Sequence, residues 1–316
     1  MTSLFRLRIL AMAIASLVAL PLHAATAYVP NEGSATISVI DTTTDKVTDT
    51  LRYGKKPRGI AIAKDGSRLY LSDQTGNALV VVDVANRKTL ATIPLGDSPE
   101  AIYLSPDGKW VSAAIEENDM VLLIDTATLK VDRKIKMKGK NPEHAVWSPD
   151  GKWIYVSAEE ADMVDIVDVG RGEVVKSVKV GDRPRGIGFL PDGSRAYVAA
   201  ENADTVNVFD TGTHEVIARI KAGSRSNGIT VHPDGKRVFV SSGGKGTVQV
   251  IDVATNAIVQ DIPVGRRPWN MALTPDGKKL YVAVGRSNLV AVIDTDSYKK
   301  VAEIPVGELP WGVVIH

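Results

Sequence analysis

The stretch GRRPWNMALTPDGKKLYVAV (residues 265–284) decides the fold, because nearly the same phrase occurs at two other places in the chain. The related stretches are GDRPRGIGFLPDGSRAYVAA (residues 181–200) and GKKPRGIAIAKDGSRLYLSD (residues 54–73). All three keep a glycine, a proline three residues later, an Asp-Gly pair and a closing apolar run. The residue directly after the proline differs, being Trp269, Arg185 and Arg58. We therefore expect the constant positions to build a scaffold and the variable position to face a ligand.

The Asp-Gly pair recurs at a fixed interval along the whole chain. Its aspartates are Asp65, Asp107, Asp150, Asp192, Asp234 and Asp276, spaced by 42, 43, 42, 42 and 42 residues. Such a period is typical of stacked units of four short strands. Asp-Gly suits a hairpin turn, because glycine adopts positive φ at no steric cost. No segment shows a sustained helical period.

The two ends of the repeat complement each other. The stretch TAYVPNE (residues 26–32) corresponds to a second strand, whereas the C-terminal GELPWGVVIH (residues 307–316) corresponds to a first strand. The sequence therefore predicts an all-β, seven-bladed β-propeller of four-stranded blades, closed by pairing the C-terminal strand with the N-terminal partial repeat. Closure removes free sheet edges. The alternative, an open solenoid, would need polar caps.

The columns YVAxxxxxTVxVID, IPVGxxPxGI and xPDGKxLYV resemble YVTN-type seven-bladed propeller repeats across residues 25–316. The whole layout also resembles the exported propeller proteins associated with alcohol catabolism dependent on pyrroloquinoline quinone (PQQ). This resemblance implies a periplasmic accessory or binding role.

The first 24 residues have the layout of a secretory signal. Arg6 and Arg8 precede an apolar run from Ile9 to Leu20, and small residues follow from Ala24. The run is too short to span a membrane. We expect a signal peptide over residues 1–24, a propeller over residues 25–316, and a periplasmic protein with no membrane insertion after processing. A buried N-terminal helix is the alternative.

Composition excludes several classes of function. The 38 basic and 37 acidic residues nearly balance, which argues against nucleic-acid binding. The absence of cysteine excludes disulfides, thiolate metal sites and a cysteine nucleophile. No histidine pair has metal-ligand spacing within a strand, so we predict neither a metal site nor a resident cofactor. His214 and His232 fall in turns, where we expect them to face solvent.

The variable position lies at the start of each inner strand, and we expect it at the mouth of the central channel. Arginine suits carboxylates or phosphates, and indole faces suit flat rings. We therefore predict a small planar anionic ligand such as PQQ, or a periplasmic protein partner. In the alternative interpretation, the tryptophans pack between blades and Arg58 pairs with Glu100 as solvated surface. The predicted ligand-binding residues are Arg58, Glu143, His144, Arg185, Asn227, Trp269, Asn270 and Trp311.

The function that we expect from these observations is non-catalytic binding, with no catalytic residue assigned. Two alternatives stay open. One is an enzyme of the lactonase or haem-binding propeller type, for which Glu100, Glu143 and His144 are the nearby polar set. The other is single-strand nucleic-acid binding through stacked tryptophans.

Overall fold

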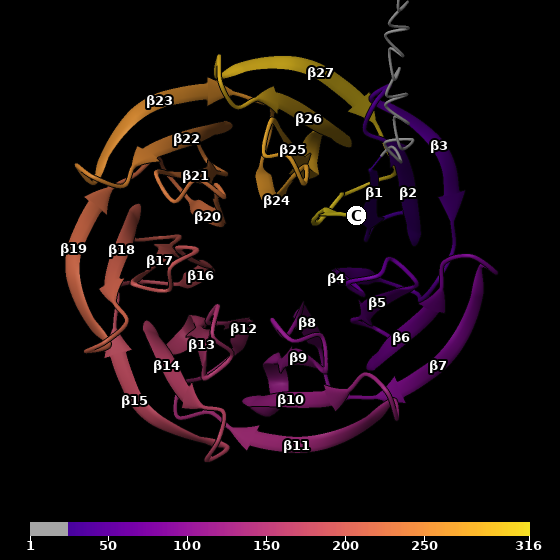
Figure 1. The fold of residues 1–316 in the computed structure, drawn as a ribbon, viewed down its shortest axis with the longest axis horizontal. Helices are drawn as coiled ribbons and strands as arrows, with labels where there is room; N and C mark the ends of the chain where they lie inside the picture. Colours follow the sequence, from indigo (N-terminus) through magenta and orange to yellow (C-terminus); the bar gives the residue numbers. More distant parts are fainter. Residues whose placement is uncertain (1–24) are drawn as a thin grey trace, which may run out of the picture.

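The computed structural model describes residues 25–316 as seven four-stranded antiparallel sheets arranged in a ring (Figure 1). The predicted signal peptide, residues 1–24, lies outside the described residues. Each sheet forms one blade that runs from an inner strand at the channel to an outer strand at the rim. Within residues 25–316, no helix is long and apolar enough to cross a membrane.

The bounds of the strands follow the repeat. The first blade holds β28 (Val314–Ile315), β1 (Thr26–Asn31), β2 (Thr36–Asp41) and β3 (Lys46–Leu51). The second holds β4 (Pro57–Ile62), β5 (Arg68–Asp73), β6 (Ala78–Asp83) and β7 (Lys88–Pro94). The third holds β8 (Pro99–Leu104), β9 (Trp110–Ile115), β10 (Met120–Asp125) and β11 (Lys130–Lys136). The fourth holds β12 (Pro142–Trp147), β13 (Trp153–Ala158), β14 (Met163–Asp168) and β15 (Glu173–Lys179).

The remaining three blades continue the pattern. The fifth holds β16 (Pro184–Phe189), β17 (Arg195–Ala200), β18 (Thr205–Asp210) and β19 (Glu215–Lys221). The sixth holds β20 (Ser226–Val231), β21 (Arg237–Ser242), β22 (Thr247–Asp252) and β23 (Ala257–Pro263). The seventh holds β24 (Pro268–Leu273), β25 (Lys279–Val284), β26 (Leu289–Asp294) and β27 (Lys299–Pro305). Single 3-10 turns connect the second and third strands of three blades: η1 (Glu116–Asn118), η2 (Glu159–Ala161) and η3 (Gly285–Ser287).

Ring closure occurs as predicted. The C-terminal strand β28 pairs with β1, with Val314 opposite Tyr28 and Ile315 opposite Ala27. The main-chain N–H of Thr26 donates to the carbonyl of His316 at 2.6 Å. The prediction of a closed seven-bladed propeller is confirmed, and the open solenoid is wrong.

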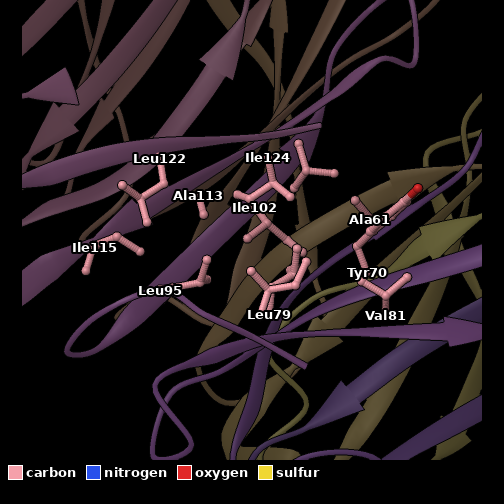
Figure 2. Close-up of a cluster of buried hydrophobic side chains, with 12 residues drawn as sticks. Ala61, Tyr70, Leu79, Val81, Leu95, Ile102, Ala113, Ile115, Leu122 and Ile124 are labelled. Atoms are coloured by element: carbon pink, nitrogen blue, oxygen red, sulfur yellow. The ribbon is translucent and has the colours of Figure 1, made fainter. Parts of the chain in front are cut away.

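The hydrophobic core lies between neighbouring blades. Figure 2 shows one such cluster, in which Tyr70 and Leu79 of the second blade meet Ile102 and Ile124 of the third. The middle strands are buried on both faces because a blade packs on each side of them, so β6 reads as the continuous apolar run ALVVVD. This packing holds each blade in a fixed orientation relative to its neighbours, and it therefore fixes where the inner strands end around the channel.

The inner strands approach one another so closely that small residues are required at most of their third positions. A Cβ on Gly186 would lie 2.5 Å from the carbonyl oxygen of Asn227 in the next blade, well inside van der Waals contact. His144 and Asn270 occupy the equivalent position in two blades. These two exceptions lie at the candidate site.

The expectation that His214 and His232 face solvent is wrong. His232 is buried, and its ring nitrogen contacts the carbonyl oxygen of Gly277 at 3.1 Å. The half-buried His214 bonds to the hydroxyl of Tyr155 at 2.7 Å through Nδ1. Both imidazoles therefore help to join strands and turns of the scaffold.

Candidate functional site at the channel mouth

Two columns of the repeat meet at one end of the channel, because the first residue of each inner strand lies opposite the last residue of the antiparallel second strand, as Pro184 lies opposite Ala200. The slot column is the variable position that follows the proline column. The loop column is the residue directly after the second strand of each blade. The slot column contains Trp311, Arg58, Glu100, Glu143, Arg185, Asn227 and Trp269. The loop column contains Glu32, Gln74, Glu116, Glu159, Glu201, Gly243 and Gly285.

Arg58 joins the two columns on one side of the channel mouth. Its Nε donates to Glu32 at 2.7 Å, and its Nη1 forms a short ion pair with Glu100. The same oxygen of Glu100 accepts from the side-chain amide of Gln74 at 2.8 Å. Because the Glu100 side chain is fully buried, the interpretation of this pair as solvated surface is wrong.

Arg185 joins the columns on the other side and is held by three carboxylates. Its guanidinium pairs with Glu143, lies 2.6 Å from Glu159, and donates through Nε to Glu201 at 2.9 Å. Burial disfavours the charged guanidinium, but the three carboxylates outweigh that cost and raise the pKa of Arg185. The guanidinium therefore stays charged and fixed in position.

Two further arginines complete this half of the network. Arg183 lies 3.2 Å from Glu159 and 3.5 Å from Glu201. Arg267 reaches Glu201 from the seventh blade at 2.6 Å. Glu201 thus pairs with arginines from two blades. Arg183 and Arg185 belong to its own blade, and Arg267 belongs to the seventh.

Glutamates outnumber arginines in this network, and the pKa values of two of the glutamates are raised as a result of burial and of repulsion between acids. Six glutamates, Glu32, Glu100, Glu116, Glu143, Glu159 and Glu201, face four arginines, Arg58, Arg183, Arg185 and Arg267. Burial and the charge of Glu143 raise the pKa of Glu100 to about 8. Burial and the same neighbour raise the pKa of Glu159 to about 7. The network therefore holds carboxyl groups that exchange protons near neutral pH.

Three of these acids also have the donor set of a cation site. Carboxylate oxygens of Glu100, Glu116 and Glu143 lie within 4.8 Å of one another. Oxygen ligands of this kind suit hard cations. Arg58 already neutralises one oxygen of Glu100, whereas Glu100 Oε2 is buried without a hydrogen-bond partner among residues 25–316. The spacing of residues within single strands could not reveal these three acids as a group. Glu100 lies on an inner strand, Glu116 lies in a loop of the same blade, and Glu143 lies on the inner strand of the next blade.

His144 and Trp311 form a separate group that crosses the channel. Their rings stack with centroids 5.9 Å apart and planes inclined by 16°. The Nδ1 atom of His144 bonds to the hydroxyl of Tyr103 at 2.5 Å. Burial, assisted by the charge of Arg185, lowers the pKa of His144 to about 3. The imidazole is therefore neutral at physiological pH.

The other predicted residues lie apart from the arginine–glutamate network. Asn270 donates from its side chain to the carbonyl of Trp311 at 3.3 Å. Trp269 packs its six-membered ring against Gly285. Asn227 is buried, and its carbonyl lies against Gly186. Within residues 25–316 the two indoles form no stacked pair, so they present no continuous aromatic surface.

The structure thus joins Arg58, Glu143 and Arg185 in one network, as their shared column predicts. Sequence reasoning left the loop column out of the predicted site, although its acids are as regular as the slot column. A signal was present: Glu116, Glu159 and Glu201 each directly follow a second strand. What was missing was the packing of the loops against the inner strands, which places Glu159 against Arg185 of the next blade and Glu201 against Arg185 of its own blade.

Comparisons with known proteins agree with this fold. The family model "Lactonase, 7-bladed beta-propeller" matches residues 173–303, and the model "YNCE-like beta-propeller" matches residues 91–224. Each match covers less than half of the chain. No curated protein sequence matches the chain significantly.

Solved structures show the same architecture over nearly the whole chain. Kuenenia stuttgartiensis hydrazine synthase is 25% identical with a TM-score of 0.79, over 85% of this chain and 92% of that chain. A candidate 6-phosphogluconolactonase from Bacteroides fragilis is 19% identical with a TM-score of 0.77, over 94% and 99%. The dihydro-haem d1 dehydrogenase NirN in complex with DHE is 16% identical with a TM-score of 0.72, over 92% and 74%.

These matches overturn the prediction that the protein is not an enzyme. The lactonase model covers Arg183, Arg185, Glu201 and Arg267, which are four of the ten residues in the channel-mouth network. The chain is a seven-bladed β-propeller similar to lactonase-type and YNCE-like propellers.

Proposed function

We propose that the protein is an exported hydrolase that opens small lactone rings at the channel mouth. The observation that carries this proposal is Glu159, a carboxyl group with a pKa of about 7 held between Arg183 and Arg185. A general base is most effective when its pKa lies near the working pH. The similarity to the lactonase model, which begins at residue 173, supports the same reaction class.

The residues present suit the steps of lactone hydrolysis. The ionised Glu159 takes a proton from a water molecule as its oxygen attacks the lactone carbonyl carbon. The charged guanidinium of Arg185 stabilises the resulting oxyanion, because it is already fixed and desolvated. The ring C–O bond then breaks, and Glu159 returns its proton to the leaving alkoxide. The product is a hydroxy acid.

The experiment is hydrolysis of glucono-δ-lactone and γ-butyrolactone, followed with a pH indicator and corrected for the uncatalysed rate. Glu159→Gln should lower kcat by about 10²-fold or more, because it removes the general base. Glu160→Gln is the matched control, since Glu160 is the adjacent, exposed acid, and it should retain the wild-type rate. Lack of catalysis by the wild type, or equal rates in the two variants, would overturn the proposal.

A second candidate function is binding of a small planar anion such as PQQ. The observation that favours it is Trp269, a partly exposed indole next to Gly285 and close in sequence to Arg267. Titration with PQQ should quench tryptophan fluorescence in the wild type and less so in Trp269→Leu. The control is Trp110→Leu, because Trp110 lies at the start of a second strand in another blade. The N-terminal pattern of residues 1–24 supports the periplasm as the location for either function.

A further inference from the structure

A basic cleft lies beside the channel mouth, between the sixth and seventh blades. It has a volume of about 600 Å³ and is lined by Arg225, Lys245, Arg266, Arg267 and Arg286, together with glycines and a proline. Among residues 25–316, no acidic side chain lines it. Its volume lies within the range of small-molecule pockets.

The change of the loop column from glutamate to glycine explains why this cleft is basic. Arg183, Arg225 and Arg267 are equivalent residues, each directly before the proline column of consecutive blades. In the fifth blade, Arg183 faces the loop-column acid Glu201 of its own blade. The sixth and seventh blades have Gly243 and Gly285 at that position.

The positive charge of the cleft is therefore largely uncompensated. Within residues 25–316, the guanidinium groups of Arg225, Arg266 and Arg286 form no ion pair with a carboxylate, and all three residues are exposed. Arg225 contacts Asp204 only through its main-chain N–H. Lys245 pairs with Asp261, and Arg267 turns one side of its guanidinium toward Glu201. Three guanidinium groups remain for an anion from outside.

Arg267 links the cleft to the channel-mouth network and also has unused donor capacity. Its Nη1 is buried without a hydrogen-bond acceptor among the described residues. Gly243 makes room for it, because a Cβ there would lie 3.2 Å from that nitrogen. A buried donor without an acceptor is costly, and an anion in the cleft would supply one.

We propose that this cleft binds the phosphate group of a small phosphorylated molecule. Guanidinium groups bind phosphate oxygens through paired, charge-assisted hydrogen bonds, and a dianion matches the cluster of uncompensated cations. The cleft is much larger than phosphate alone, so the rest of the molecule also has room. The site rests on the cleft's own residues and does not depend on the proposed hydrolysis.

The test is calorimetric titration of residues 25–316 with inorganic phosphate and with glycerol 3-phosphate, in a low-salt buffer free of multivalent anions. We expect saturable one-site binding of both, weakened at least tenfold in Arg266→Gln/Arg286→Gln. The matched control is Arg171→Gln, an exposed arginine in a turn of the fourth blade, which should bind like the wild type.

Two outcomes would overturn the assignment. One is the absence of saturable phosphate binding, or binding that the double substitution leaves unchanged while circular dichroism shows intact folds. The other is tighter binding of succinate than of glycerol 3-phosphate, which would identify a dicarboxylate site. Because the readout is binding heat, neither result depends on whether the protein hydrolyses lactones.

Discussion

The imidazole of His144 stacks on the indole of Trp311, although the two residues belong to the fourth and first blades. Trp311 lies shortly before β28 (Val314–Ile315), the strand that closes the ring. Its main-chain N–H donates to the carbonyl of Pro30 at 2.9 Å, so the pairing of the chain ends positions the indole. The pairing of the chain ends that closes the propeller therefore also positions Trp311 against His144 at the channel mouth.

Deleting residues 311–316 should lower the melting temperature by at least about 5 °C. The deletion removes the pairing with β1 and the buried Val313, and each lost kcal/mol lowers Tm by roughly 2–4 °C in a domain of this size class. Thermal unfolding followed by circular dichroism provides the measurement. His316→Ala is the control, because it keeps the main-chain bonds and should melt within about 1 °C of the wild type. An unchanged Tm in the truncated protein would contradict the role of closure.

Arg185→Gln should destabilise the fold by about 3–5 kcal/mol, because it leaves the buried Glu143 without its paired cation and removes one of the cations from Glu159 and Glu201. Arg171→Gln removes an exposed arginine from Asp168 and should cost no more than about 1 kcal/mol. Urea denaturation at pH 7 measures both free energies of unfolding. Equal costs for the two variants would show that the channel-mouth pairs behave as ordinary surface pairs.

Glu100→Gln should change how stability depends on pH. The folded protein binds the Glu100 proton more tightly than the unfolded chain does, since the pKa rises from 4.5 to about 8 on folding. The stabilisation from Glu100 is therefore complete below about pH 4.5 and is lost as the pH rises toward 8, at about 1.4 kcal/mol per pKa unit. The wild type should lose stability relative to Glu100→Gln between pH 5 and pH 8.

The measurement is urea denaturation of both proteins at several pH values. Glu117→Gln is the control, because Glu117 is exposed in the neighbouring loop and should give a constant difference from the wild type. A constant difference for Glu100→Gln as well would show that burial leaves the titration of Glu100 unperturbed in the folded state.

The repeat made most of the fold predictable, whereas the site was predictable only in part. Closure followed from the complementary ends, because only TAYVPNE lacked an inner strand and only GELPWGVVIH could supply it. Arg58, Glu143 and Arg185 were found through one variable column. Glu159 and Glu201 were left out of the predicted site because their role depends on which arginines a loop side chain reaches, in its own blade or in another. The stacking of His144 on Trp311 depends on the width of the channel, which no spacing along the chain specifies.

The most direct test of the account is the pH dependence of kcat/KM for glucono-δ-lactone. If Glu159 is the general base, kcat/KM should rise with pH as this carboxyl group loses its proton, with a midpoint near its pKa of about 7. Glu159→Gln should abolish this step, and Glu160→Gln should leave it in place. A wild-type profile that is flat between pH 5.5 and pH 8.5, or an unchanged step in Glu159→Gln, would contradict the central claim that the channel-mouth carboxylates perform the chemistry.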